Sequence, residues 1–134
     1  MADLRFFSDR SLGDHGVPEA LRAAGWTIVS MRERYGATTA QALADIDWIT
    51  DASAEGEVLL TGDKAIAKRP LEARAVAAAS ARVFALGSSS LTGPQKAQRF
   101  LDQQRAIFRR VTRDAGPYVI SVGAHGLETL KLFT

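Results

Sequence analysis

Val58-Leu59-Leu60-Thr61-Gly62-Asp63 is an apolar run that ends on a single aspartate, and Leu4-Arg5-Phe6-Phe7-Ser8-Asp9 repeats the pattern near the N-terminus. The first of these runs does not alternate with polar residues, which predicts a strand buried on both faces. In an open α/β sheet, ligands gather outside the carboxyl ends of the strands, so two parallel neighbours ending this way would bring Asp9 and Asp63 together. Like charges held that close need a cation between them. Hard divalent ions such as magnesium bind one or two carboxylates with water and substrate phosphate, so the pattern points to phosphate-ester chemistry.

Strand patterns and helix patterns alternate along the rest of the chain. Further strands are predicted over 26–31, 58–61 and 83–86, and helices over 17–24, 38–54, 71–81 and from Thr92 to about Asp114. The polar segment 32–36 is expected only to lead away from the second strand. Two last strands, over 118–122 and 127–132, are expected to form a closing hairpin. This order predicts a three-layer α/β sandwich with a mainly parallel central sheet, folded as one domain over residues 1–134.

Bulk composition sets the broad class. Hydrophobic residues make up 46% of the 134 residues and charged residues 24%, as in an ordinary soluble globular protein. No uninterrupted apolar stretch is long enough to cross a bilayer, and the N-terminus lacks the basic region and apolar core of a secretory signal. We therefore expect no membrane association and a cytoplasmic location. The net charge of +2 and a pI of about 9.3 are compatible with nucleic-acid binding but do not require it.

The residue types available restrict the chemistry of a metal site. The chain has no cysteine, which excludes disulfides, thiolate zinc sites and cysteine nucleophiles. Its two histidines, His15 and His125, lie far apart in the sequence, which makes a histidine-based metal site improbable. Oxygen ligands remain.

A third acid is predicted from the helical segment 38–54, which carries Asp45, Asp47 and Asp51. At about 100° per residue, Asp45 lies within about 40° of the apolar positions 49 and 52, whereas Asp47 and Asp51 point about 160° and 120° away from Asp45. Asp45 therefore borders the buried face, and the other two are expected to face water. Asp45 is the third candidate ligand, with Asp47 in reserve. Trp48 is expected in the core.

Asp9 and Asp63 also have a purely local interpretation. Aspartate commonly begins a turn or caps the following helix, and for either residue alone this is the simpler explanation. Two aspartates at equivalent ends of two strands favour a shared site if those strands are adjacent. The sequence does not show whether they are.

Cationic side chains stand beside both aspartates in the sequence. Arg10 follows Asp9, and Lys64, Lys68 and Arg69 follow Asp63. Charge runs are usually solvated surface, but a phosphodiester next to a metal also needs lysine and arginine contacts that position it. The segment from Thr92 to Asp114 has the same two interpretations. Its apolar positions share one side and the other side is basic, with Lys96, Arg99, Arg105, Arg109, Arg110 and Arg113.

Five segments together resemble the PIN-like proteins related to VapC-type toxins. They are Arg5–Gly13 (RFFSDRSLG), Val17–Gly25 (VPEALRAAG), Asp45–Ile49 (DIDWI), Leu59–Lys64 (LLTGDK) and Leu91–Gly93 (LTG). The opening and the "LLTGDK" segment are the more specific, and the resemblance spans nearly the whole chain. It implies a PIN-like fold, a ribonuclease dependent on Mg2+ or Mn2+, and a partner antitoxin that restrains it.

Carried over by position, the resemblance places the first, second and third acids of the family on Asp9, Asp45 and Asp63. PIN nucleases usually gather a fourth acid near the third. Here Lys64 follows Asp63, and the next acid is Glu72, inside a predicted helix. This departure leaves the number of metal ions open and makes loss of activity conceivable.

The sequence therefore predicts a divalent-metal-dependent ribonuclease that hydrolyses RNA phosphodiester bonds as the toxin of a toxin-antitoxin pair. Asp9, Asp45 and Asp63 would be the catalytic metal ligands, and Arg10, Lys64, Lys68 and Arg69 would contact substrate. RNA and an antitoxin are the expected partners, and a homodimer is left open. One alternative is an inactive PIN-like module that binds RNA or a partner. A receiver-like phosphoacceptor fits less well, because no acid pair precedes the first helix.

Overall fold

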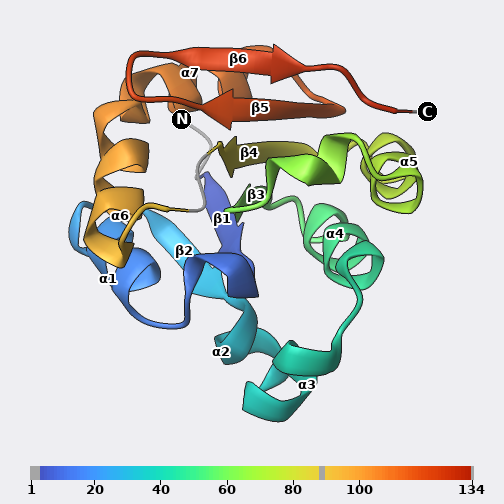
Figure 1. Cartoon of the computed structure of the whole chain (residues 1–134), viewed down its shortest axis with the longest axis horizontal. Coiled ribbons are helices and arrows are strands. Elements are labelled where there is room, and N and C mark those ends of the chain that lie inside the picture. The colour runs from blue at the N-terminus through green and yellow to red at the C-terminus, as the bar shows by residue number, and fades with distance from the viewer. Residues whose placement is uncertain (1–3, 88–89, 134) are drawn as a thin grey trace.

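Six strands form one central sheet in the order β2-β1-β3-β4-β5-β6 (Figure 1). The computed structural model describes residues 4–87 and 90–133; the expected lack of a secretory signal rests partly on residues 1–3, outside these ranges. The strands are β1 (Arg5–Ser8), β2 (Thr27–Ser30), β3 (Val58–Thr61), β4 (Arg82–Leu86), β5 (Tyr118–Val122) and β6 (Leu127–Leu130). Neighbours from β2 to β5 are parallel, and β6 pairs antiparallel with β5. The mainly parallel sheet and the closing hairpin are confirmed.

Helices cover both faces of this sheet. One face carries α1 (Gly16–Ala23), α6 (Gly93–Asp102) and α7 (Gln104–Arg113), and the other carries α2 (Met31–Tyr35), α3 (Ala37–Ala42), α4 (Asp45–Ala54) and α5 (Pro70–Ala79). Two 3-10 turns, η1 (Arg10–Leu12) and η2 (Lys64–Ala67), follow β1 and β3. In Figure 1, α1 and α6 lie to the left of the sheet and α4 and α5 to its right. The predicted three-layer α/β sandwich is confirmed.

Strand β3 shows why the core has two halves. Its residues alternate between the faces: Val58 and Leu60 pack with the residues of α1, α6 and α7, and Leu59 packs with those of α4 and α5. All three are fully buried, which confirms the predicted burial on both faces. Burial of a Val or Leu side chain stabilises the folded state by about 1.5 to 3 kcal/mol, so this short strand contributes strongly to the stability of the fold.

Both long predicted helices are wrong in one respect, because each is broken in the middle. The segment 38–54 divides into α3 and α4 at Leu43 and Ala44, whose backbones are extended. The segment 92–114 divides into α6 and α7 at Gln103, which has φ −103° and ψ 12°. No glycine or proline stands at either break, so local propensity carries no signal there. Ala42 and Ile46 belong to the apolar pattern that predicts a helix over 38–54, and both are exposed.

The segment 32–36 forms most of a short helix, α2, where only a polar connection is predicted. Its N-terminus has a capping box, in which Ser30 accepts from the backbone N–H of Glu33 and Glu33 accepts from the backbone N–H of Ser30. Two otherwise unpaired backbone donors are satisfied in this way. The Ser30 and Glu33 spacing is visible in the sequence.

The basic side of α6 and α7 is only partly free. Arg105, Arg109 and Arg113 are exposed, whereas Arg99 is half-buried. Arg110 departs from the expectation of a uniformly solvated face. Its guanidinium lies 5.2 Å from the ring centroid of Tyr118, and it donates to Asp114 and Thr129. This arginine is therefore part of the packing between α7 and the hairpin.

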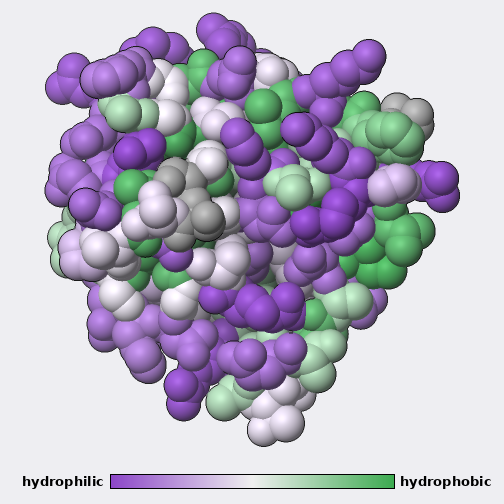
Figure 2. Space-filling model, in the orientation of Figure 1, coloured by the Kyte–Doolittle hydropathy of each residue, from purple (hydrophilic) through white to green (hydrophobic). Residues whose placement is uncertain are grey.

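Hydrophilic side chains cover most of the face seen in Figure 2, and apolar residues reach the surface mainly at the right, near α5 and the C-terminal segment. The large exposed hydrophobic side chains of the described residues are Ile46, Leu71 and Phe133. Within residues 4–87 and 90–133, no helix has the length and apolar character needed to cross a membrane.

Candidate functional site

The ends of β1 and β3 meet at one edge of the sheet. The strands are parallel neighbours with Ser8 opposite Leu60, and the backbone N–H of Asp9 donates to the Leu60 carbonyl over 3.1 Å. Asp9 and Asp63 therefore leave adjacent strands on the same edge. Each also caps the 3-10 turn that follows, since Asp9 accepts from the Ser11 N–H and Asp63 from the Ala65 N–H. Asp9 and Asp63 therefore both cap local turns and lie at the same edge of the sheet.

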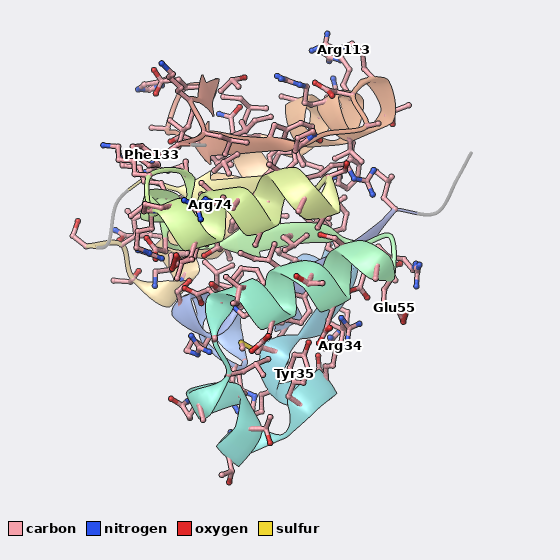
Figure 3. The ribbon with its side chains drawn as sticks, turned by 90° about the vertical axis from the view of Figure 1, so that its right-hand side faces the viewer. Arg34, Tyr35, Glu55, Arg74, Arg113 and Phe133 are labelled. Atoms are coloured by element: carbon pink, nitrogen blue, oxygen red, sulfur yellow. The ribbon has the colours of Figure 1, made fainter. Side chains whose placement is uncertain are left out.

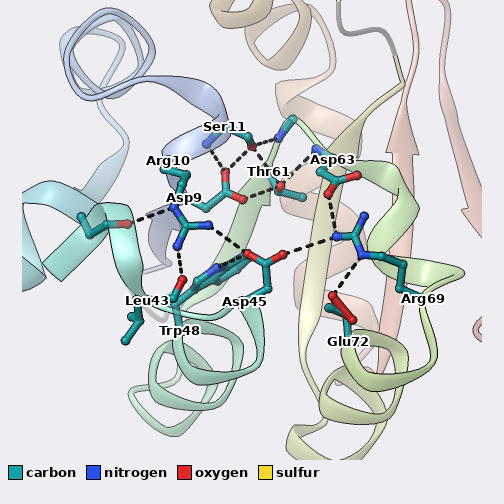
Figure 4. Close-up of polar contacts among 12 residues, drawn as sticks. Asp9, Arg10, Ser11, Leu43, Asp45, Trp48, Thr61, Asp63, Arg69 and Glu72 are labelled. Atoms are coloured by element: carbon teal, nitrogen blue, oxygen red, sulfur yellow. Dashed lines mark hydrogen bonds and ion pairs between the residues drawn. The ribbon is translucent and has the colours of Figure 1, made fainter. Parts of the chain in front are cut away.

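Asp9 is a buried carboxylate with only neutral donors around it (Figure 4). Its side chain accepts from the backbone N–H and the hydroxyl of Ser11 on one oxygen, and from Thr61 Oγ1 over 2.7 Å on the other. The residue is 4% exposed. Loss of hydration raises the pKa of Asp9, the hydroxyl hydrogen bonds lower it and the nearby charge of Asp45 raises it. The net result is a pKa of about 6. The buried negative charge has no bonded cation among the described residues.

Asp45 stands at the start of α4, where the helix turns toward the sheet edge. Its Oδ1 accepts from the indole N–H of buried Trp48 over 2.9 Å and from Arg10 over 3.3 Å. The indole thus combines the predicted core position with a second role of fixing the carboxylate. Asp47, the reserve candidate, is exposed.

Arg69 forms hydrogen bonds with several acidic side chains of the site. Its guanidinium donates to Asp63 over 2.7 Å, to Asp45 over 3.3 Å and to Glu72 over 3.0 Å (Figure 4). The hydrogen bonds to Asp63 and Glu72 raise the pKa of Arg69 above its ordinary value, so the group stays charged. Asp45 and Asp63, though distant in the sequence, are therefore held on one cation that the chain itself supplies.

The donor set suits a hard divalent cation in its chemistry, because Asp9, Asp45 and Asp63 offer only carboxylate oxygens and Asp9 is a buried anion with no cationic partner among residues 4–87 and 90–133. Arg69 contacts two of these three carboxylates. Within the described part of the chain, no three His, Asp or Glu side chains are arranged around a single point as metal ligands would be. A metal ion bound by Asp45 and Asp63 would thus compete with the guanidinium for the same oxygens.

The four predicted substrate contacts have different surroundings. Arg10 donates to the carbonyls of Ala40 and Leu43 as well as to Asp45, so it joins the break between α3 and α4 to the site. Lys64 and Lys68 are exposed. Arg10 and Arg69 are thus hydrogen-bonded to the protein, whereas the two lysines are exposed residues.

Several side chains at the site were not predicted as members. Ser11 and Thr61 bind Asp9, and Glu72 reaches the other acids through Arg69. Lys96 on α6 donates to the Ser11 carbonyl over 3.2 Å, although the helical pattern assigns it to the basic surface. The hydroxyls lie within two residues of the key aspartates, which is a weak signal. Lys96 gives no such signal, since it is 85 residues from Ser11.

This chain is similar to a known protein family and to a named relative. The family described as "PIN like domain" matches residues 4–88, which include β1 to β4 and all three aspartates. A Mycobacterium tuberculosis protein named "Putative ribonuclease VapC45" is 37% identical over 123 residues, covering 91% of this chain and 88% of that protein. No solved structure matches the chain. With that family match over more than half of its length, this chain belongs to the PIN-like domain family.

Proposed function

We propose that this protein is a divalent-metal-dependent endoribonuclease and the toxin of a toxin-antitoxin pair. The observation that carries the proposal is that Asp9 and Asp63 leave adjacent parallel strands at one edge of the sheet and that Asp45 shares Arg69 with Asp63, while Asp9 is buried without a cationic partner among the described residues. The relative named as a ribonuclease supports RNA as the substrate. An antitoxin partner follows from the resemblance to VapC-type toxins and is part of the proposal.

In this proposal Asp9, Asp45 and Asp63 hold Mg2+ or Mn2+. The ion, when bound, supplies an activated water and neutralises charge on the phosphoryl oxygens. Ser11 and Thr61 fix both oxygens of Asp9, and Trp48 with Arg10 fixes Asp45. These hydrogen bonds preorganise the ligands before substrate binds.

The substrate phosphate is positioned by cations at the same edge. The ammonium of Lys64 lies beside the end of β4, where a Cβ built on Gly87 would be 3.7 Å from its Nζ. Lys64 is exposed and can therefore meet a phosphate beside Asp63. Arg69 becomes available to a phosphate if it leaves Asp45 and Asp63.

The direct test is cleavage of RNA by the purified protein with Mg2+ or Mn2+, compared with excess EDTA. We expect cleavage with either ion, none in EDTA, and none from Asp63→Asn at saturating metal. Cleavage that persists in EDTA would overturn the metal-nuclease proposal.

A catalytically inactive RNA- or partner-binding module is a second candidate, and the position of Arg69 favours it. A guanidinium already bound to Asp45 and Asp63 neutralises the charge that would attract a metal. A protein that binds RNA but cuts it with no divalent ion would support this candidate instead.

Replacing Arg69 by glutamine tests the competition between guanidinium and metal. We expect Arg69→Gln to tighten Mn2+ binding by about tenfold or more, because a full positive charge leaves the neighbourhood of two ligands. Isothermal titration calorimetry on metal-free protein measures this directly. Arg74→Gln is the matched control, since it removes the same charge from an exposed position on α5. Unchanged or weaker Mn2+ binding by Arg69→Gln would show that Arg69 does not compete.

A further inference from the structure

Two adjoining hollows lie between η2 and the C-terminal end of the hairpin. One, of about 160 Å3, is lined by Lys64, Ala67, Lys68, Leu130 and Lys131. The other, of about 300 Å3, is lined by Lys68, Lys131, Leu132 and Phe133. Lys68 and Lys131 line both hollows, and we call the surface that the two hollows form together the lysine groove.

The lysine groove is basic and starts next to the acidic site. Lys64, Lys68 and Lys131 are all exposed, and within residues 4–87 and 90–133 none of them is bonded to a carboxylate. No Asp or Glu lines either hollow. Lys64 follows Asp63 directly, and Lys68 precedes the Arg69 that binds Asp63. A polyanion positioned beside Asp63 would therefore have Lys64 and Lys68 nearby along the chain.

Phe133 is an aromatic ring held at the far end of the lysine groove. It is 59% exposed, so much of the ring is open to a ligand. Its backbone N–H donates to the Ala67 carbonyl over 2.8 Å, so its position relative to η2 is fixed. In Figure 3, Phe133 lies at the same end of the molecule as Arg74, opposite Glu55 and Arg34.

We propose that the lysine groove binds single-stranded RNA on one side of the scissile phosphate, with Lys68 and Lys131 contacting backbone phosphates and Phe133 stacking on a base. Proteins bind single strands by this combination of a basic groove and an exposed aromatic ring, and stacking is tolerant of sequence. The proposal rests on the proposed RNA substrate and adds the surface that holds it. Lysines without acidic partners favour a polyanion over an apolar partner segment.

Binding and cleavage are separated by measuring RNA affinity in the Asp9→Asn background in EDTA. The probe is a fluorescein-labelled decauridine followed by anisotropy. We expect Phe133→Ala and Phe133→Leu to weaken binding by about fivefold to a hundredfold, and Phe133→Trp to retain it, because only an aromatic ring stacks. Leu71→Ala is the matched control, since Leu71 is also a large exposed apolar side chain and lies outside the lysine groove.

The lysines are tested by the salt dependence of the same binding. Lys68→Ala with Lys131→Ala should reduce the slope of log affinity against log salt by about 0.7 for each phosphate that the protein no longer neutralises. Arg105→Ala with Arg109→Ala removes the same charge from exposed positions on α7 and should leave more of the slope. Equal reductions from both pairs, or unchanged binding by the groove variants, would overturn the proposal. So would groove variants that bind RNA normally but no longer bind an antitoxin.

Discussion

Asp9→Asn is expected to abolish RNA cleavage and, at the same time, to stabilise the metal-free protein. The loss of one ligand charge removes several kcal/mol of transition-state stabilisation, which corresponds to a decrease in rate of about a thousandfold or more. The asparagine fits the same space. Its oxygen keeps the two bonds from Ser11, and its amide can donate to Thr61 Oγ1, a hydroxyl that also accepts from the Asp63 N–H. The rate of RNA cleavage under single-turnover conditions measures the loss of activity.

The gain in stability follows from the raised pKa of Asp9. Burial raises it to about 6 from an ordinary value of 3.8, so the folded protein takes up a proton that the unfolded chain does not between these two pH values. The free energy of unfolding therefore falls as pH rises through this window. At pH 7 the ionised carboxylate costs on the order of 3 kcal/mol, at about 1.36 kcal/mol for each pKa unit, and asparagine avoids this cost.

Urea unfolding in EDTA at pH 4 and pH 7 checks this prediction. The advantage of Asp9→Asn should be large at pH 7 and close to zero at pH 4. Asp47→Asn is the control, because Asp47 is an exposed carboxylate on α4. An Asp9→Asn protein that is less stable than wild type at pH 7 would show that the carboxylate is not strained by burial.

Arg34→Met is expected to destabilise the fold by about 3 kcal/mol or more. Arg34 on α2 makes a two-pronged ion pair with Glu57, with N to O distances of 2.6 and 2.5 Å, and its guanidinium lies 5.1 Å from the ring centroid of Phe7. Glu57 directly precedes β3 and is 5% exposed. Removing the arginine leaves a buried carboxylate unpaired, which costs about 3 to 5 kcal/mol. The hydrogen bonds that Arg34 donates to Glu57 also raise the pKa of Arg34, in keeping with a strong pair.

The double variant Arg34→Met with Glu57→Gln should recover most of the loss, because the unpaired charge is then gone. Urea unfolding at pH 7 measures both variants. Arg32→Met is the matched control on the same helix: its partner Asp14 lies 3.5 Å away and the Arg32 side chain is 47% exposed, so a loss under about 1 kcal/mol is expected. Losses in the double variant that simply add would contradict a buried-charge mechanism.

The sequence predicted the parts of the fold that depend on local pattern. The unalternating β3, the closing hairpin and the alternation of strands with helices were all recognisable, because burial on two faces and tight turns select particular residues nearby. The breaks at Leu43–Ala44 and Gln103 were not, since those residues favour no particular break and the chain turns there to pack. Ser30 and Glu33 are an intermediate case: their spacing in the sequence is that of a capping box, and the helix that it begins, α2, differs from the polar connection predicted there.

By itself, the sequence determined that Asp9 and Asp63 follow two strands and that Asp45 borders the buried face of a helix, because strand and helix periods fix where a side chain starts. Only the tertiary structure decided that β1 and β3 are neighbours and that Arg69 binds Asp45, Asp63 and Glu72 together. Strand order depends on how whole helices cover the sheet. The guanidinium of an arginine is several rotatable bonds from the backbone. Its hydrogen-bond partners therefore depend on which carboxylates lie nearby in the folded protein.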